Sequence, residues 1–214
     1  MSKVLIIGAS RGTGLETVKA ALRAGHMVRA LARSAASIPI NDAGLDKVTG
    51  DALDSEIIRK ALHDRDVAIQ TLGVDISPRA VFERTTLFSL STRILVDAMK
   101  AVGMKRLIAV TGLGAGDSRG HGGFLYDAVA FPLLLKRVYE DKDGQEWIIR
   151  SSGLDWTIVR PGLLANGPAT DNYRVLTEPS DWRFGVITRA NVADFIIRQI
   201  DDHALIGATP LLIN

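Results

Sequence analysis

Residues 4–33 constrain the fold of this chain more than any other stretch. Residues 4–7 form a continuous apolar run, which is typical of a strand buried on both faces of a parallel sheet. Three glycines follow this run, namely Gly8, Gly12 and Gly14. From Thr13 the apolar spacing becomes helical, and a second apolar run, Met27–Ala32, predicts another strand. The stretch therefore predicts a strand, a glycine-rich turn, a helix and a strand.

The glycine-rich turn predicts a phosphate-binding site. Glycines let the backbone approach a pyrophosphate closely, and the helix N-terminus adds N–H donors and a partial positive charge. Here the glycines follow the first expected strand and lie at the start of the first expected helix, as this mechanism requires. We therefore expect the turn to bind a dinucleotide; a tight turn that binds no ligand is the alternative.

The end of the second strand indicates which dinucleotide is bound. An acid there binds a free ribose 2′-hydroxyl, whereas a cation accommodates a 2′-phosphate. The strand ends at Arg33, no acid occurs between Thr17 and Asn41, and Arg11 lies in the turn itself. A guanidinium can bind a phosphate through two parallel hydrogen bonds, so these residues favour NADP over NAD. The alternative is that Arg33 is a solvated loop residue.

Composition sets the broad class of the protein. The chain has 214 residues, 47% of them hydrophobic, and no linker or repeat divides it, so we expect one domain over residues 1–214. Its net charge of +2 comes from dispersed cations, which argues against a nucleic-acid partner. Cysteine is absent and the four histidines are scattered, so no metal site is expected. No apolar run is long enough to span a membrane, and we expect a cytoplasmic location.

Strands alternate with helices along the rest of the chain. We expect strands at 66–72, 106–111, 155–159, 182–187 and 211–213, and helices at 54–62, 87–102, 127–152 and 188–200. One face of the second of these helices would carry Leu87, Leu90, Ile94, Ala98 and Val102. Residues 112–123 and 163–181 are expected to be irregular. The alternation predicts an α/β fold, a doubly wound parallel sheet of the Rossmann type in a single domain.

Asp51 lies where a third strand, ending in Val48-Thr49-Gly50, would stop. Its carboxylate is placed to accept a hydrogen bond from the adenine amino group. It is also placed to help cap the helix for which Asp54 is the expected N-cap. The spacing leaves both roles open.

Several motifs resemble those of a known family. They are residues 8–14, Gly50-Asp51, Thr71-Leu72-Gly73, residues 153–162 and residues 188–193. Together they look like an atypical short-chain dehydrogenase/reductase, in the NAD(P)H-binding group that contains flavin reductase/biliverdin-IXβ reductase and the NmrA-like proteins. The resemblance covers nearly the whole chain and specifies the superfamily rather than a substrate. One departure is Arg11-Gly12, since the atypical branch usually has its middle glycine one position earlier.

The resemblance implies a set of cofactor contacts. The implied contacts are Gly8, Ser10, Arg11, Gly12, Thr13 and Gly14 around the pyrophosphate, Arg33 at the 2′-phosphate, Asp51 and Ala52 beside adenine, Leu72 and Gly73 at the adenosine ribose, Thr111 and Lys142 at the nicotinamide ribose, and Pro161, Gly162 and Leu163 at the carboxamide.

Catalytic members of the superfamily transfer a proton through a Tyr that is followed four residues later by a Lys. No tyrosine of this chain has a Lys at that distance. Lys142 and Glu146 keep the Lys-to-Glu spacing of the catalytic helix, but Val138 stands at the Tyr position and Tyr139 is one residue out of register. Lys142 is therefore either a ribose contact or a solvated charge in the run Glu140-Asp141-Lys142-Asp143.

The candidate catalytic residues are Thr111, Tyr126 and Lys142. Reductases of this branch can transfer a hydride directly to an electron-poor conjugated ring and take the proton from solvent, so the cofactor carries the chemistry. Thr111 and Tyr126 are the candidate proton donors. Gly112 stands where the flavin and biliverdin reductases have a serine, which weakens that specific analogy.

The substrate is expected beyond the carboxyl ends of the strands, among segments 73–81, 112–131 and 163–181. The middle segment is rich in glycine and is either a lid over a flat substrate or a surface loop. We expect an NADPH-dependent oxidoreductase, a monomer or homodimer, that transfers hydride to a small conjugated or aromatic acceptor of the flavin or quinone kind. The alternatives are a non-catalytic NADP(H)-binding regulator or redox sensor of the NmrA type and, less expected, a sugar-nucleotide epimerase-like enzyme.

Overall fold

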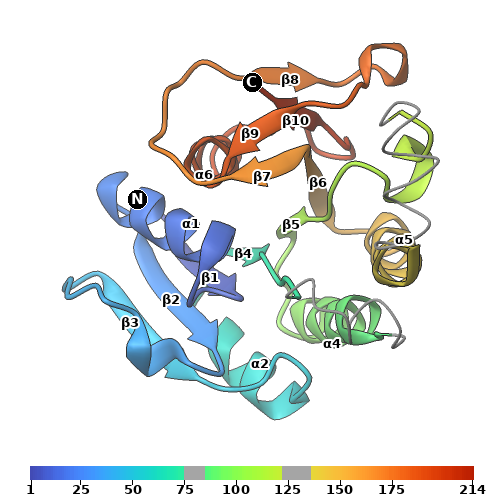
Figure 1. Cartoon of the computed structure of the whole chain (residues 1–214). Coiled ribbons are helices and arrows are strands. Elements are labelled where there is room, and N and C mark those ends of the chain that lie inside the picture. The colour runs from blue at the N-terminus through green and yellow to red at the C-terminus, as the bar shows by residue number, and fades with distance from the viewer. Residues whose placement is uncertain (75–84, 122–135) are drawn as a thin grey trace.

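The computed structural model describes residues 1–74, 85–121 and 136–214. Its main sheet contains β1 (Lys3–Ile7), β2 (Met27–Ala32), β3 (Leu45–Thr49), β4 (Val67–Gln70), β5 (Arg106–Val110), β6 (Asp155–Pro161), β8 (Arg174–Leu176) and β10 (Leu211–Ile213). They lie in the order β3-β2-β1-β4-β5-β6-β10-β8 (Figure 1). The chain moves outward from β1 in one direction through β2 and β3, then returns beside β1 at β4. The predicted doubly wound α/β fold is confirmed.

The sheet is not parallel throughout. The strands from β3 to β10 pair in parallel, but β8 pairs antiparallel with β10, with Leu212 opposite Val175. Strand β8 lies within residues 163–181, which we predicted to be irregular, and that prediction was wrong for this part. Strands of three residues are too short to produce a clear alternation of apolar and polar side chains.

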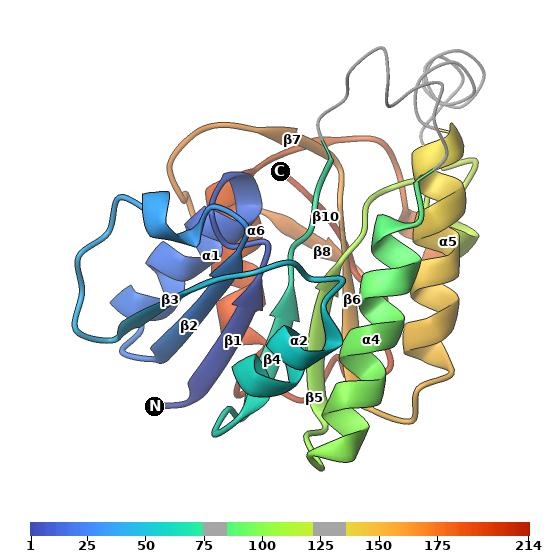
Figure 2. The ribbon, with the colours of Figure 1, turned by 90° about the horizontal axis from the view of Figure 1, so that it is seen from below.

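The helices cover both faces of the sheet. On one face lie α1 (Gly12–Arg23) and α6 (Arg189–Arg198); on the other lie α2 (Ser55–Leu62), α4 (Leu87–Ala101) and α5 (Lys136–Arg150), with α4 and α5 side by side (Figure 2). Alternate residues of β1 supply the two cores: Val4 and Ile6 face α1 and α6, whereas Leu5 and Ile7 face the other layer. A strand buried on both faces explains the continuous apolar run. No helix in the described part of the chain is long and apolar enough to cross a membrane.

The buried face of α4 differs from the predicted one. Leu90 and Val102 are 46% and 47% exposed, while the buried side chains are Phe88, Ser91, Thr92, Leu95, Val96 and Met99. The polar members pair with an amide of β4: the Gln70 side chain donates to Ser91 Oγ at 3.2 Å and accepts from Thr92 Oγ1 at 2.8 Å. Because a buried amide needs hydrogen-bonding partners, this pairing turns a partly polar side of the helix inward.

A second, two-stranded parallel sheet consists of β7 (Leu163–Ala165) and β9 (Val186–Thr188). The strand predicted at 182–187 therefore begins late, and Trp182 instead packs in a small cluster with Leu113, Leu211 and Ile213. Gly185, which directly precedes β9, allows the small sheet to approach the main one, because a Cβ there would lie 2.6 Å from Ile213 Cγ2 of β10.

The glycine-rich turn packs directly on the ends of β1 and β4. Gly8 has φ +86°, and a Cβ there would lie 2.9 Å from the Thr71 carbonyl oxygen. Gly14, inside α1, is closer still, since a Cβ would lie 2.1 Å from the Gly8 carbonyl oxygen. Any side chain at either position would push α1 away from the sheet.

Gly14→Ala should lower the free energy of unfolding by about 2 kcal/mol or more, because the added methyl overpacks backbone that cannot move aside. Gly144→Ala is the matched control within α5, where a Cβ would meet Ser89 Cβ at 3.4 Å. It should be neutral or stabilising by up to about 1 kcal/mol, as helix propensity predicts. Urea unfolding of both variants checks this. Equal stabilities would contradict the packing argument.

Candidate dinucleotide-binding site

A cavity of about 960 Å³ opens at the carboxyl ends of β1, β2, β4 and β5. It lies at the point where the strand order reverses, which is where open α/β sheets bind ligands. Of the cofactor-contact residues predicted from the sequence, all but Gly14 line this cavity. Gly14 instead packs α1 against the end of β1. The structure thus brings together residues that are as far apart in the sequence as Gly8 and Leu163.

The start of α1 forms one wall of the cavity. Gly12 has φ +56° and begins the helix, and Arg11 at the N-cap position makes no side-chain cap bond. The first turn, Gly12-Thr13-Gly14-Leu15, contains no acid that would compete with a bound anion. A helix N-terminus of this kind fits a phosphate group.

The charges that line the cavity are mostly positive. Among the described lining residues, the cations are Arg11, Arg33, Lys142 and Arg189, and the carboxylate is Asp51. Asp51 Oδ1 accepts a hydrogen bond from the Leu53 amide at 3.0 Å, whereas Asp54 caps α2 by accepting from the Glu56 and Ile57 amides. The capping alternative for Asp51 is therefore wrong, and its adenine contact stays a prediction. The excess of cations matches a polyanionic ligand such as a dinucleotide.

Lys142 is buried, and the alternative of a solvated charge is wrong. Its Nζ donates to the Thr111 carbonyl oxygen at 2.9 Å and lies 4.3 Å from the centre of the Phe88 ring. Burial lowers the pKa of Lys142 to about 8, although the carboxylates of Glu146 and Asp141 act in the opposite direction. Asp141 is also buried, where it accepts from the amides of Phe88 and Ser89 at the start of α4.

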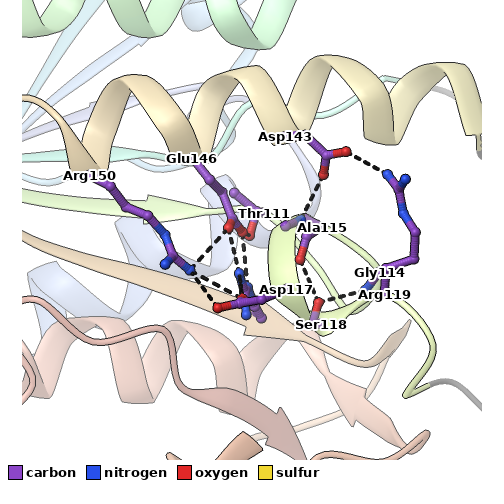
Figure 3. A network of polar contacts seen from close by, with 11 residues as sticks. Thr111, Gly114, Ala115, Asp117, Ser118, Arg119, Asp143, Glu146 and Arg150 are labelled. Carbon is purple, nitrogen blue, oxygen red and sulfur yellow. Dashed lines mark hydrogen bonds and ion pairs between the residues drawn. The ribbon is translucent and has the colours of Figure 1, made fainter.

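A network of ion pairs, centred on the buried Arg160 and Glu146, lies behind the cavity (Figure 3). Arg160 of β6 is fully buried and binds Glu146 of α5, with Nε 3.0 Å from Oε1, and Asp117 at 2.6 Å. Burial alone would lower the pKa of Arg160, but the hydrogen bonds and charges of Glu146 and Asp117 raise it above its ordinary value. Thr111 Oγ1 also donates to Glu146 Oε1, at 2.8 Å. Its hydroxyl proton is thus directed into the network, which argues against Thr111 as the proton donor.

The same helix holds the start of the predicted substrate segment 112–131. Asp143 Oδ1 accepts from the Gly116 amide at 2.7 Å, and its other oxygen pairs with Arg119. Gly116 has φ +55°, and a Cβ there would lie 2.5 Å from Glu146 Oε2. The run of charges in α5 therefore anchors residues 112–121. Tyr126, the rest of this segment and residues 75–81 of the first segment lie outside the described residues.

Four residues that the sequence did not single out also line the cavity: Tyr139, Asn166, Phe184 and Arg189. A Cβ on Gly112 would lie 2.7 Å from the Tyr139 hydroxyl, so this side chain reaches the cavity. Tyr139 lines the cavity together with Val138, the residue at the expected Tyr position. Residues three apart on a helix share a face, and Tyr139 and Lys142 have this spacing. Arg189 could have been identified from the sequence, because it belongs to the family-like motif at residues 188–193.

The lowered pKa of Lys142 predicts a pH-dependent stability. Between about pH 8 and pH 10.5 the unfolded chain keeps this lysine protonated and the folded chain does not, so the free energy of unfolding rises with pH. Relative to Lys142→Met, which retains length without charge, the wild type should gain about 3 kcal/mol over this window and nothing below it. Urea unfolding from pH 7 to 10.5 measures the difference. A constant difference would show that Lys142 titrates normally.

Comparisons with known proteins agree with this geometry. A model of the NAD(P)H-binding family matches residues 8–203. YhfK of Bacillus subtilis, described as an uncharacterized sugar epimerase, is 29% identical over 204 residues, which are 94% of this chain and 88% of that protein. The structure of ChuY, an anaerobilin reductase from Escherichia coli O157:H7, has a TM-score of 0.81 at 28% identity and covers 99% of this chain and 97% of its own.

A short-chain dehydrogenase/reductase from Veillonella parvula, solved in complex with NADP, has a TM-score of 0.82 at 18% identity and covers 100% of this chain and 95% of its own. This likeness is one of fold. The family match spans the glycine-rich turn, the cavity and α6 alike. The chain therefore belongs to the NAD(P)H-binding family.

Proposed function

We propose that this protein is an NADPH-dependent reductase that transfers a hydride to a small conjugated or aromatic acceptor, such as a flavin- or quinone-like compound. The observation that carries the proposal is a single cavity with two chemically different ends. One end has the start of α1 with Arg11 and Arg33, and the other is apolar and aromatic. The relation to ChuY, whose structure is described as that of an anaerobilin reductase, supports a reductase.

The choice of NADP rests on Arg11 and Arg33. Arg33 directly follows β2, is exposed and lines the cavity beside Ser34, whose Oγ donates to Ser10 Oγ at 3.0 Å. This bond ties the end of β2 to the glycine-rich turn. Two guanidinium groups at this junction suit a ribose 2′-phosphate, and no carboxylate of the described lining residues takes the place that a 2′-hydroxyl needs.

The acceptor would lie at the other end of the cavity. Apolar and aromatic side chains line that end, namely Leu72, Phe88, Leu113, Leu163, Leu164 and Phe184. Such walls bind a flat conjugated molecule and exclude water from it. A bound reduced nicotinamide supplies the hydride, while the protein orients the two rings and keeps the site dry.

The residues for proton transfer follow from the contacts of α5. We propose that Lys142, whose Nζ is held by the Thr111 carbonyl oxygen, contacts the nicotinamide ribose. Tyr139 carries a hydroxyl that reaches the cavity, whereas the Thr111 hydroxyl donates to Glu146. Tyr139 is thus a further candidate donor among the described residues. The role of Tyr126, a cytoplasmic location, and a monomeric or homodimeric state stay predictions.

A second candidate is a non-catalytic NADP(H)-binding regulator or redox sensor. It is favoured by Val138, which stands where the superfamily's catalytic Tyr would precede Lys142. The same observation argues against an epimerase-like activity, despite the description of YhfK, because such enzymes require that Tyr.

The reductase is tested by following NADPH absorbance with purified protein and a panel of FMN, FAD, quinones and dichlorophenolindophenol. We expect saturable oxidation of NADPH by at least one acceptor, above the rate without protein. Tight NADPH binding with no turnover across the panel would refute the reductase in favour of the sensor.

Arg33→Ala should weaken NADPH binding by about tenfold or more, as expected for the loss of hydrogen bonds to a charged group, and leave NADH binding nearly unchanged. Arg23→Ala, at the exposed C-terminal end of α1, is the control for a general loss of positive charge. Isothermal titration calorimetry measures both dissociation constants. Equal losses for NADPH and NADH in Arg33→Ala would overturn the assignment of Arg33 to the 2′-phosphate.

A further inference from the structure

Arg189 lies against the glycine-rich turn. It is the first residue of α6, and its side chain lies beside Gly12, where an added Cβ would be 3.7 Å from Arg189 Nε. Nη1 donates to Asn166 Oδ1 at 2.8 Å, and both residues line the cavity. The guanidinium is therefore held at the start of α1 by a partner from another element.

The small sheet explains how Arg189 and Asn166 meet. In the β7–β9 pair, Ala165 is the register partner of Thr188. Asn166 and Arg189 are the next residues of the two parallel strands, so they leave the same end of the pair side by side. The close approach of Gly185 to Ile213 of β10 sets this pair against the main sheet. The pairing thus carries both side chains to the mouth of the cavity.

Two helix N-termini meet at this point. Helices α1 and α6 pack together (Figure 1). They begin at Gly12 and Arg189, and the Arg189 side chain lies beside Gly12. Each N-terminus carries about half a positive charge, and Arg189 adds a full one. Asp51, the carboxylate among the described lining residues, follows β3 and not either of these helices. Positive charges so close together repel one another unless an anion lies between them.

We propose that Arg189, positioned by Asn166, binds the diphosphate of the dinucleotide over Gly12, so that the small sheet and α6 complete a phosphate site that α1 begins. Arg189 is then a cofactor-binding residue and Asn166 a positioning residue. The proposal rests on dinucleotide binding in this cavity and holds for NADPH and NADH alike, since both contain the diphosphate. It depends neither on the choice of NADP nor on the nature of the acceptor.

The test is a set of titrations with ligands that differ in their phosphates. Calorimetry of Arg189→Gln with NADPH, NADH and ADP-ribose should show a similar loss of affinity for all three, about tenfold or more, as for a lost hydrogen bond to a charged group. Adenosine 2′-monophosphate, which lacks the diphosphate, should bind as it does to the wild type. Arg33→Ala should give the opposite pattern, with a loss for the 2′-monophosphate and NADPH but not for ADP-ribose.

Two further variants separate the effect of the charge from that of its position, and a third serves as a control. Arg189→Lys keeps the charge but not the planar fork, so its loss of ADP-ribose affinity should be intermediate. Asn166→Ala leaves Arg189 unheld and should weaken ADP-ribose by a smaller factor without changing the thermal midpoint. Arg198→Gln removes an exposed cation from the same helix, which pairs with Asp171 and Asp194, and should leave all affinities unchanged.

Unchanged ADP-ribose affinity in a folded Arg189→Gln variant would overturn the proposal. If in addition the acceptor's KM rose, Arg189 would serve an anionic group of the acceptor instead. A loss of ADP-ribose affinity in a protein that turns over no acceptor would uphold the diphosphate contact and refute the reductase. A protein that binds NADH better than NADPH, and still loses both in Arg189→Gln, would refute only the NADP preference.

Discussion

The close contact between α1 and the end of β1 determines the position of the site. The Gly8 carbonyl lies so near Gly14 that a Cβ would come within 2.1 Å of its oxygen, and Gly8 itself packs on the backbone of Thr71. Without side chains at these points the helix starts directly above the crevice between β1 and β4. Its N–H groups and its positive end are consequently directed at whatever binds there. The other residues that line the cavity, such as Arg33 and Leu163, lie around the start of α1.

A second constraint comes from the charges buried behind the cavity. Arg160, Glu146 and Asp117 connect β6, α5 and the loop after β5, and Arg160 also lies with its guanidinium 5.0 Å from the Trp182 ring. Arg160 and Glu146 are buried, and burying such ions is costly unless each has partners, so the three elements are held in one relative arrangement. Thr111 and Lys142 are attached to this network on the cavity side. The part of the cavity proposed for the nicotinamide and acceptor is therefore built on a rigid support.

The cavity thus has a division of charge that suits one kind of ligand. The cations lie at the glycine-rich turn, the end of β2, α5 and the start of α6, whereas the walls formed by Leu113, Leu163 and Phe184 are apolar. In the proposed binding mode, a dinucleotide places its phosphates at the glycine-rich turn, the end of β2 and the start of α6, and its nicotinamide near Lys142 and the apolar walls. This division supports reduction of an apolar, conjugated acceptor better than chemistry on a sugar, which would need polar partners at the second end.

The sequence alone determined the fold class and the dinucleotide-binding unit, because their signals are local, whereas the family resemblance implied most of the other residues that line the cavity. An apolar run, glycines at a strand-to-helix turn and an arginine after β2 each act through residues close in the chain. The partners of the buried polar groups required the tertiary structure. The sequence left Lys142 open between a ribose contact and a solvated charge in a run that includes Asp141, whereas in the structure contacts with α4 and Thr111 bury both side chains. Arg189 and Asn166 are 23 residues apart and meet only because β7 and β9 pair. Such contacts depend on which elements pack together, and the spacing of residues along the chain does not predict that packing.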